Sequence, residues 1–159
     1  KHLGHHLPLF SRALEGIELS YRKGWSGNSL AEAIKVSSQR DIERGSTGPG
    51  PHKADLYLSL DGTAARERLS RGEQKTMTAA MILAQAQLIC ESGEKPILML
   101  DDLSSEFDEV HLGRVLNAGL DLGVQIWLTG TQLISAIRAC KGTYTVFHVE
   151  QGGVSRVDA

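Results

Sequence analysis

Apolar segments of strand length alternate with helix-length segments after residue 55 of the chain. Leu56, Leu58 and Leu60 alternate with polar residues and run into Asp61-Gly62, a pair favoured in two-residue turns, so an antiparallel hairpin is predicted here. Ser70 followed three residues later by a glutamate is typical of a helix N-terminus. The Ala-, Leu- and Met-rich stretch that follows predicts a long helix ending near residues 92–96.

The continuously apolar run at residues 96–100 predicts a strand buried on both faces of a parallel sheet, and residues 124–129 predict a second buried strand. Helices are expected over 110–120 and 134–139. A strand over 144–149, a tight turn and an edge strand would close the chain. The alternation of strand and helix predicts an α/β fold, with a parallel sheet as its core and flanking helices.

The first third of the chain is more polar and less regular. A helix is expected over 3–14, and Ile17, Leu19 and Tyr21 alternate as in a strand over 17–25. A second helix should begin after Asn28 or Ser29 as its cap. Its predicted inner face is formed by Leu30, Ala33, Ile34 and Ile42. Prolines and glycines make residues 45–52 a loop. We therefore expect an accessory or lid segment over 1–47 and a second domain over 48–159.

Composition narrows the class of protein. The 159 residues carry 17 basic and 19 acidic side chains, a net charge of −2 that gives no global support for nucleic-acid binding. A basic cluster at Arg66, Arg68, Arg71 and Lys75 could contact DNA phosphates or could simply be solvated. No apolar run is long enough to span a bilayer, so no membrane role is expected.

Other sequence features indicate the cellular compartment and whether the chain is part of a longer protein. Cys90 and Cys140 lack metal or disulfide spacing, which favours a reducing cytoplasm. No signal peptide is recognisable at the start, and the first residue is Lys1, so we expect the interior of a longer chain.

Paired carboxylates mark one candidate site. Asp101 and Asp102 end the most apolar predicted strand, and ligands of open α/β sheets lie beyond the carboxyl ends of strands. Asp101 could hold Mg²⁺ directly or through water, and Asp102 could orient or deprotonate an attacking water. The alternative is that both residues merely begin a loop and favour the next helix N-terminus.

A second candidate site lies at the start of the long helix. Ser70 offers a hydroxyl, Gly72 lets a phosphate approach the backbone, and the helix N-terminus attracts anions. A capping box alone would explain Ser70 and Glu73 but not Gly72, which weakens a first turn. Because no Gly-Lys pair occurs in the chain, the usual phosphate-cradling loop is absent from these 159 residues. The sequence therefore predicts part of a nucleotide site.

Four segments in order resemble the C-terminal half of the RecF family, which is related to the SMC-type ABC ATPases. They are GPHKADL (residues 50–56), the Asp-Gly hairpin, LSRGEQK (69–75) and ILMLDDLSSEFD (97–108). The resemblance extends over nearly the whole chain and is weakest over the first forty residues. It implies the head of an SMC- or RecF-like ABC ATPase, with residues 48–159 as its C-terminal lobe.

The resemblance also implies roles for single residues. Ser70, Gly72 and Gln74 would contact ATP held by the partner subunit of a dimer. Asp101 would serve the Mg²⁺ site, and Asp102 would be the catalytic carboxylate. Ser105, Glu106 and Asp108 would lie in the loop that crosses the dimer interface, and Thr131 would be the switch residue. Gly130, Gln132 and Phe107 depart from the family pattern.

The function implied by the resemblance is DNA replication, repair and recombination, including the SOS response. The expected protein is cytoplasmic, binds single-stranded or gapped duplex DNA, dimerises with ATP and Mg²⁺, hydrolyses ATP slowly, and works with the mediator proteins RecO and RecR. Without a phosphate-cradling loop, the chain alone is not expected to hydrolyse ATP.

Two alternatives stay open, and one residue has no assigned role. The chain could be a non-enzymatic DNA- or protein-binding module of another SMC-like ABC protein. A transporter ATPase is disfavoured by Asp102 and the Gly-Pro-His segment. His52 could reach phosphate or DNA, or could stabilise its own loop through a hydrogen bond.

Overall fold

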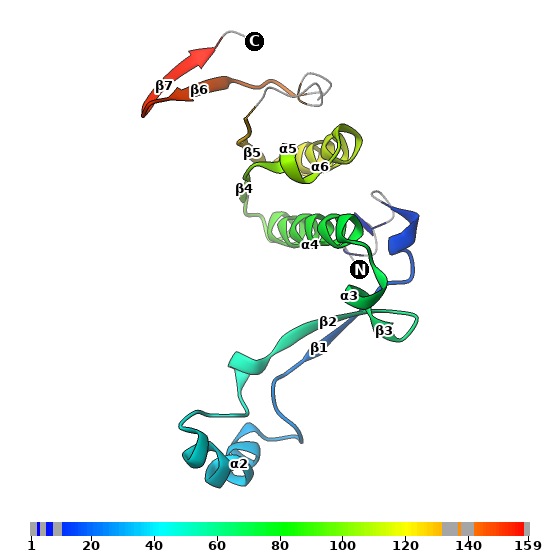
Figure 1. Ribbon diagram of the computed structural model, residues 1–159, viewed down its shortest axis with the longest axis vertical. Helices are drawn as coiled ribbons and strands as arrows, with labels where there is room; N and C mark the ends of the chain where they lie inside the picture. The colour runs from blue at the N-terminus through cyan, green and yellow to red at the C-terminus, as the bar shows by residue number, and fades with distance from the viewer. Residues whose placement is uncertain (1–2, 4–5, 8–10, 132–136, 138–141, 158–159) are drawn as a thin grey trace. The chain divides into compact units, whose positions relative to one another are not determined.

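The computed structural model describes residues 3, 6–7, 11–131, 137 and 142–157 (Figure 1). The chain divides into two compact units. The arm unit spans Ala13–Gln74, and the sheet unit comprises the described residues before Ala13 and from Lys75 onward. The division predicted at residues 47 and 48 rests on sequence features alone and stays a prediction.

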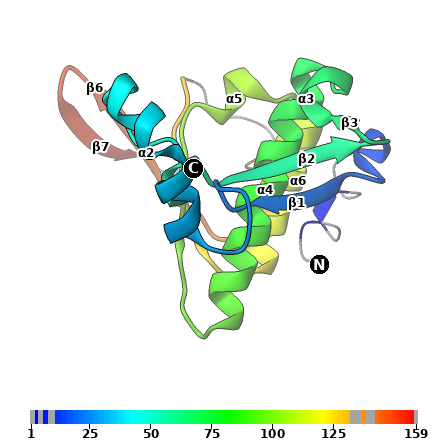
Figure 2. The same ribbon diagram turned by 90° about the horizontal axis from the view of Figure 1, so that it is seen from below.

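An antiparallel sheet organises the arm unit, with strand order β1-β2-β3. Its strands are β1 (Glu18–Arg22), β2 (Asp55–Leu60) and β3 (Thr63–Ala64). Figure 2 shows β1 and β2 side by side, as their register requires, with Tyr21 opposite Leu56. Asp61 and Gly62 have φ angles of 50° and 75°, as a type I′ turn needs. The predicted hairpin and its turn are confirmed.

Helix α2 (Leu30–Arg44) begins as predicted, because the Ser29 side chain accepts a hydrogen bond from the Glu32 amide. Its inner face was predicted wrongly in part. Ile34 and Ile42 are 41% and 77% exposed, whereas Leu30 and Ala33 are half-buried. The half-buried stripe continues through Ser37 and Asp41, whose side chains share a 2.7 Å hydrogen bond. Polar contacts therefore replace the expected apolar ones on this face.

The Gly/Pro loop packs closely against the end of β1. A Cβ on Gly24 would lie 2.2 Å from the Gly50 carbonyl oxygen, and the Gly50 amide donates to the Gly24 carbonyl at 3.1 Å. The short 3₁₀ turn η2 (Pro51–Lys53) follows, and His52 Nε2 donates to the Thr47 carbonyl at 3.0 Å. Of the two interpretations of His52, this hydrogen bond favours loop stabilisation.

Two helices follow the hairpin. Helix α3 (Ala65–Arg68) is a single turn that the sequence did not predict, and α4 (Arg71–Glu91) is the predicted long helix. Near the chain start, the structure describes a 3₁₀ turn, η1 (Arg12–Leu14), with Leu14 fully buried. Most of the helix predicted over 3–14 lies outside the described residues.

The core of the sheet unit is the parallel pair β4 (Ile97–Leu100) and β5 (Gln125–Leu128). Helix α6 (Glu109–Asp121) packs on this pair at very short range. A Cβ on its Gly119 would lie 2.9 Å from Ile126 Cδ1 and 3.3 Å from Leu98 Cδ2. Glycine thus lets the helix approach the strands, and Leu112 and Val115 beside it are almost fully buried.

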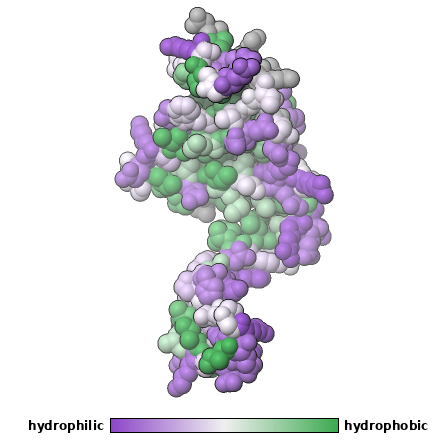
Figure 3. All heavy atoms as spheres, turned by 60° about the vertical axis from the view of Figure 1, so that its left-hand side comes forward, coloured by the Kyte–Doolittle hydropathy of each residue, from purple (hydrophilic) through white to green (hydrophobic). Residues whose placement is uncertain are grey.

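The sequence predicted that both faces of β4 are buried, and this prediction is wrong for the described structure. Leu98 and Leu100 are buried, but Ile97 and Met99 on the opposite face are 58% and 79% exposed. The described helices of this unit cover one face of the pair, so burial follows the two-residue period of a strand. Figure 3 shows apolar side chains at the surface near β4, and others at the α2 end.

The chain closes with an antiparallel hairpin of β6 (Val146–Glu150) and β7 (Gly153–Val157), as predicted. Its turn residues Gln151 and Gly152 both have positive φ angles, 48° and 81°. Among described residues this hairpin forms a sheet of its own. The helix predicted over 134–139 falls almost entirely outside the described residues. The predicted α/β class, with a parallel sheet and flanking helices, is confirmed.

Candidate functional site

Asp101 and Asp102 meet Thr129 at the carboxyl ends of β4 and β5. Because the strands are parallel, residues that follow them emerge at the same edge of the sheet. The Thr129 amide donates to the Leu100 carbonyl at 3.0 Å and extends the pairing by one residue. The Thr129 hydroxyl donates to Asp101 Oδ1 and accepts from the Asp102 amide at 3.0 Å. The two aspartates therefore share one hydroxyl.

Asp102 adopts a left-handed backbone conformation, with φ 46° and ψ 38°. This region is uncommon for residues other than glycine, although aspartate enters it more readily than most. The conformation starts the short helix α5 (Leu103–Glu106). Ser105 Oγ lies 2.9 Å from both the carbonyl oxygen and Oδ2 of Asp102. Backbone and carboxylate of Asp102 are thus held from two sides, by Thr129 and by Ser105.

The Asp101–Asp102 pair fits a magnesium ion better than a metal that requires an all-protein cage. Both residues are exposed, and carboxylate oxygens are ligands that Mg²⁺ prefers. Within the described part of the chain, no group of three or more His, Cys, Asp or Glu side chains is placed to hold a metal. Mg²⁺ commonly uses one or two carboxylates and takes its remaining ligands from water and phosphate.

The predicted signature loop forms a complete capping box at the start of α4. The Ser70 amide and hydroxyl donate to Glu73 Oε2 at 2.7 and 2.6 Å, and the Glu73 amide donates back to Ser70 Oγ at 3.3 Å. These bonds from Ser70 hold the pKa of Glu73 below its usual value. The structure therefore supports the capping role of Ser70, which is an exposed residue at a helix N-terminus.

Gly72 has no packing explanation within the described chain. It is exposed, and apart from its chain neighbours and the backbone of its own helix, a Cβ added to it would meet no described atom within 4 Å. Glycine in a first turn costs helix stability, roughly 0.5–1 kcal/mol relative to alanine. Gln74 instead has a clear local role, since its side-chain amide donates to the Leu69 and Arg66 carbonyls at 2.9 and 3.1 Å. Gln74 thus fixes the loop that carries Ser70 and Gly72.

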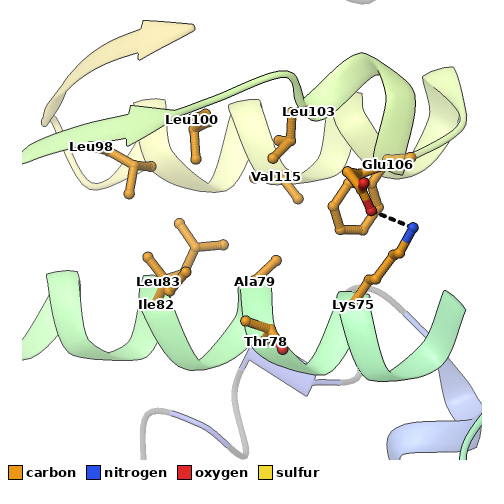
Figure 4. Close-up of a pocket in the computed structure, with 11 residues that line it drawn as sticks. Lys75, Thr78, Ala79, Ile82, Leu83, Leu98, Leu100, Leu103, Glu106 and Val115 are labelled. Carbon is orange, nitrogen blue, oxygen red and sulfur yellow. Dashed lines mark ion pairs between the residues drawn. The ribbon is translucent and has the colours of Figure 1, made fainter. Parts of the chain in front are cut away.

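The three predicted interface residues all make contacts within the sheet unit. Ser105 bonds to Asp102, as described above. Glu106 pairs with Lys75 at one end of an apolar cavity of about 220 Å³ between α4, β4, α5 and α6 (Figure 4). Leu83, Leu100 and Val115 line the cavity. Because this lining is apolar, the cavity is unsuited to phosphate.

Asp108 is the N-cap of α6. Its carboxylate accepts bonds from the His111 amide at 2.8 Å and from the His111 ring, which together lower the pKa of Asp108. The predicted role of Asp108 at a dimer interface stays a prediction, as do those of Ser105 and Glu106.

Thr131 and the basic cluster of Arg66, Arg68, Arg71 and Lys75 are not among the residues that hydrogen-bond to one another around Asp101, Asp102 and Thr129. Thr131 is exposed two residues beyond Thr129, and its switch role stays a prediction. Arg68 lies 3.5 Å from Asp61, and Lys75 pairs with Glu106. Acidic neighbours therefore offset part of the positive charge of the cluster, which favours a solvated surface over a DNA contact.

Sequence reasoning missed Thr129, although a signal for it was present. It is the polar residue that ends the second predicted strand, and polar residues at the carboxyl ends of neighbouring parallel strands meet at one edge. The resemblance drew attention to Thr131 instead. The missing information was the register of β4 against β5.

Curated relatives of the chain are DNA replication and repair proteins. The DNA replication and repair protein RecF of Xanthomonas euvesicatoria pv. vesicatoria (strain 85-10) is 38% identical over 141 residues, which is 87% of this chain and 38% of the relative. The RecF protein of Shewanella halifaxensis (strain HAW-EB4) is 33% identical over 98% of this chain and 42% of the relative. The chain therefore spans about two fifths of the length of these relatives. No protein-family model matches the chain.

Solved structures agree at the level of the fold. The recombination mediator protein RecF-ATPrS in the RecFOR pathway superposes with a TM-score of 0.71 and 22% identity, over 99% of this chain and 44% of that chain. The SmcHead bound to the C-winged helix domain of ScpA gives a TM-score of 0.54 and 12% identity, over 98% of this chain and 41% of the other.

The chain has the fold of the RecF and SmcHead structures, with paired aspartates after the parallel strand β4. Among proteins of this fold, the chain matches the C-terminal part of RecF proteins, as its motifs predicted.

Proposed function

We propose that the chain is the C-terminal part of a RecF-like DNA repair and recombination protein that binds and hydrolyses ATP as a dimer. The observation that carries this proposal is the bonded group of Asp101, Thr129 and Asp102 at the ends of two parallel strands. The similarity to DNA replication and repair proteins named RecF supports the biological role. Slow hydrolysis, binding to single-stranded or gapped DNA, cooperation with RecO and RecR, and a cytoplasmic location belong to the same proposal.

The residues of the proposed site divide into two roles. Asp101 would hold Mg²⁺ through its carboxylate, and Asp102 orients the attacking water and accepts its proton. When bound, Mg²⁺ neutralises charge on the phosphate oxygens. Ser105 keeps the Asp102 carboxylate in place at 2.9 Å. Because phosphoryl transfer depends mainly on positioning and charge stabilisation, a rigidly held carboxylate suits this reaction.

Ser70 and Gly72 would serve the other role, as a contact for the nucleotide of a second subunit. The capping box fixes the Ser70 hydroxyl at the start of α4, whose aligned peptide dipoles favour an anion there. Gly72 leaves open space where a phosphate could approach the backbone. Gln74 holds this loop from within the same subunit through its bond to Leu69.

The Asp102→Asn substitution tests this assignment in a full-length protein that contains the chain. Asparagine also tolerates the left-handed conformation, so the fold should persist. We expect ATP affinity to be kept and the turnover rate to fall by about 10²–10⁴-fold, the range that general-base catalysis contributes. Steady-state phosphate release and nucleotide titration measure the two quantities.

Asp121→Asn, at the exposed C-terminal end of α6, is the matched control and should leave turnover unchanged. Wild-type turnover in the Asp102→Asn protein would overturn the role given to Asp102.

A further inference from the structure

Thr129 forms hydrogen bonds to both predicted active-site aspartates. Its amide is bonded to the Leu100 carbonyl at 3.0 Å, so its position is set by the same parallel pairing that sets Asp101. Its hydroxyl has one hydrogen to donate and two lone pairs that accept. The hydrogen is directed to Asp101 Oδ1, and a lone pair receives the Asp102 amide at 3.0 Å. Both bonds can therefore exist at the same time.

We propose that Thr129 is a positioning residue for both aspartates. Its bond to Oδ1 fixes the rotation of the Asp101 carboxylate and keeps the other oxygen, Oδ2, as the one available to a metal or its water. Its bond to the Asp102 amide holds the backbone at the left-handed turn, where φ is 46°. This inference rests on the proposed function, because it presumes that the aspartates handle Mg²⁺ and water.

The left-handed backbone conformation of Asp102 explains why its amide needs a hydrogen-bond partner. A non-glycine residue in a sparsely populated backbone region is disfavoured by itself and persists only when its surroundings fix it. Ser105 secures the carbonyl and carboxylate of Asp102, but the amide is bonded to Thr129. Loss of the Thr129 hydroxyl would release the amide of Asp102 and the Oδ1 atom of Asp101 in a single step.

Two substitutions in the full-length protein separate the hydroxyl from the shape of the side chain. Thr129→Val keeps the branched shape and removes both hydrogen bonds, whereas Thr129→Ser keeps the hydroxyl. We expect Thr129→Val to lower ATP turnover by about 10–100-fold, as for other groups that orient metal ligands, with a smaller change in ATP affinity. Thr129→Ser should stay within about threefold of wild type, because it retains both hydrogen-bonding functions.

A second readout does not depend on turnover. Mn²⁺ replaces Mg²⁺ in a titration with ATP present, and electron paramagnetic resonance reports the free ion. Thr129→Val should weaken Mn²⁺ binding by about tenfold or more, and Thr129→Ser should restore it. Thr145→Val, at an exposed position just before β6, is the matched control and should change neither readout.

The outcomes separate this inference from the proposed function. A wild-type protein that turns over ATP, together with a Thr129→Val protein of equal turnover and Mn²⁺ affinity, would overturn the role of Thr129 alone. Equal losses in Thr129→Val and Thr129→Ser would also overturn it, since the hydroxyl would not be the cause. A wild-type protein without ATP turnover would overturn the proposed function, and the role of Thr129 with it.

Discussion

At the scale of single residues, two carboxylates at helix starts are held in their charged form by local bonds. Glu73 receives the Ser70 hydroxyl and amide, and Asp108 receives the amide and ring of His111. In both cases these hydrogen bonds lower the pKa of the carboxyl group. A negative charge at these positions also interacts favourably with the positive end of the helix dipole.

The direction of the pKa shifts predicts how stability depends on pH. A carboxyl group whose pKa is lower in the folded state stabilises the fold above its unfolded pKa, and this contribution is lost as pH falls through the folded pKa. Glu73→Ala should therefore lower the free energy of unfolding relative to wild type. We expect this loss to be largest near pH 7 and to shrink below about pH 4. Urea unfolding at several pH values measures it.

The control for this experiment is Glu94→Ala, at an exposed position in the turn after α4. Its effect on unfolding should be small at every pH. A Glu73→Ala effect that stays constant from pH 7 to pH 3 would contradict a contribution from the charged form.

At the scale of elements, local signals predicted starts and turns well, and burial less well. Ser29 caps α2, Ser70 caps α4, and Asp61 with Gly62 forms the hairpin turn, all as predicted. These features depend on residues at most four positions apart, so the sequence carries them directly. The burial of β4 and the inner face of α2 depend on what packs against them, which the local pattern does not contain.

Two neighbouring residues on β4 provide a test of its one-sided burial. Leu100 is 7% exposed and lines the apolar cavity, whereas Met99 is 79% exposed on the other face. Leu100→Ala should lower the free energy of unfolding of the chain by about 2–5 kcal/mol, as is usual for a buried leucine. Met99→Ala, the matched control, should cost about 0.5 kcal/mol or less, as for an exposed side chain.

Urea unfolding of the 159-residue chain gives both values. Equal losses in Leu100→Ala and Met99→Ala would show that both faces of β4 are covered, as the continuously apolar sequence first suggested.

At the scale of the whole molecule, the residues that we propose for nucleotide contact belong to different units. Asp101, Asp102 and Thr129 lie in the sheet unit, and Ser70 and Gly72 lie in the arm unit. The chain spans about two fifths of its RecF relatives and has no Gly-Lys pair that could cradle phosphates. No helix among the described residues has the length and apolarity to cross a membrane.

This distribution predicts the behaviour of the 159-residue chain with nucleotide. The chain has no Gly-Lys loop to place backbone amides and a lysine around the β- and γ-phosphates. We therefore expect a dissociation constant for ATP above about 1 mM, and we expect no ATP hydrolysis by the chain alone. Isothermal titration with ATP and Mg²⁺ measures the affinity, and the full-length protein titrated in parallel is the control. Micromolar affinity of the chain alone would contradict the proposal that it supplies only part of the site.

The sequence by itself determined the α/β class, the helix caps, the Asp-Gly turn and the two aspartates after an apolar strand, because each depends on neighbouring residues or on a simple period. Only the tertiary structure decided that Thr129 lies between Asp101 and Asp102. That contact joins residues 28 positions apart, and it follows from the parallel register of β4 and β5. Register depends on how the apolar residues of both strands pack across the sheet, so the pattern of one strand by itself does not specify it.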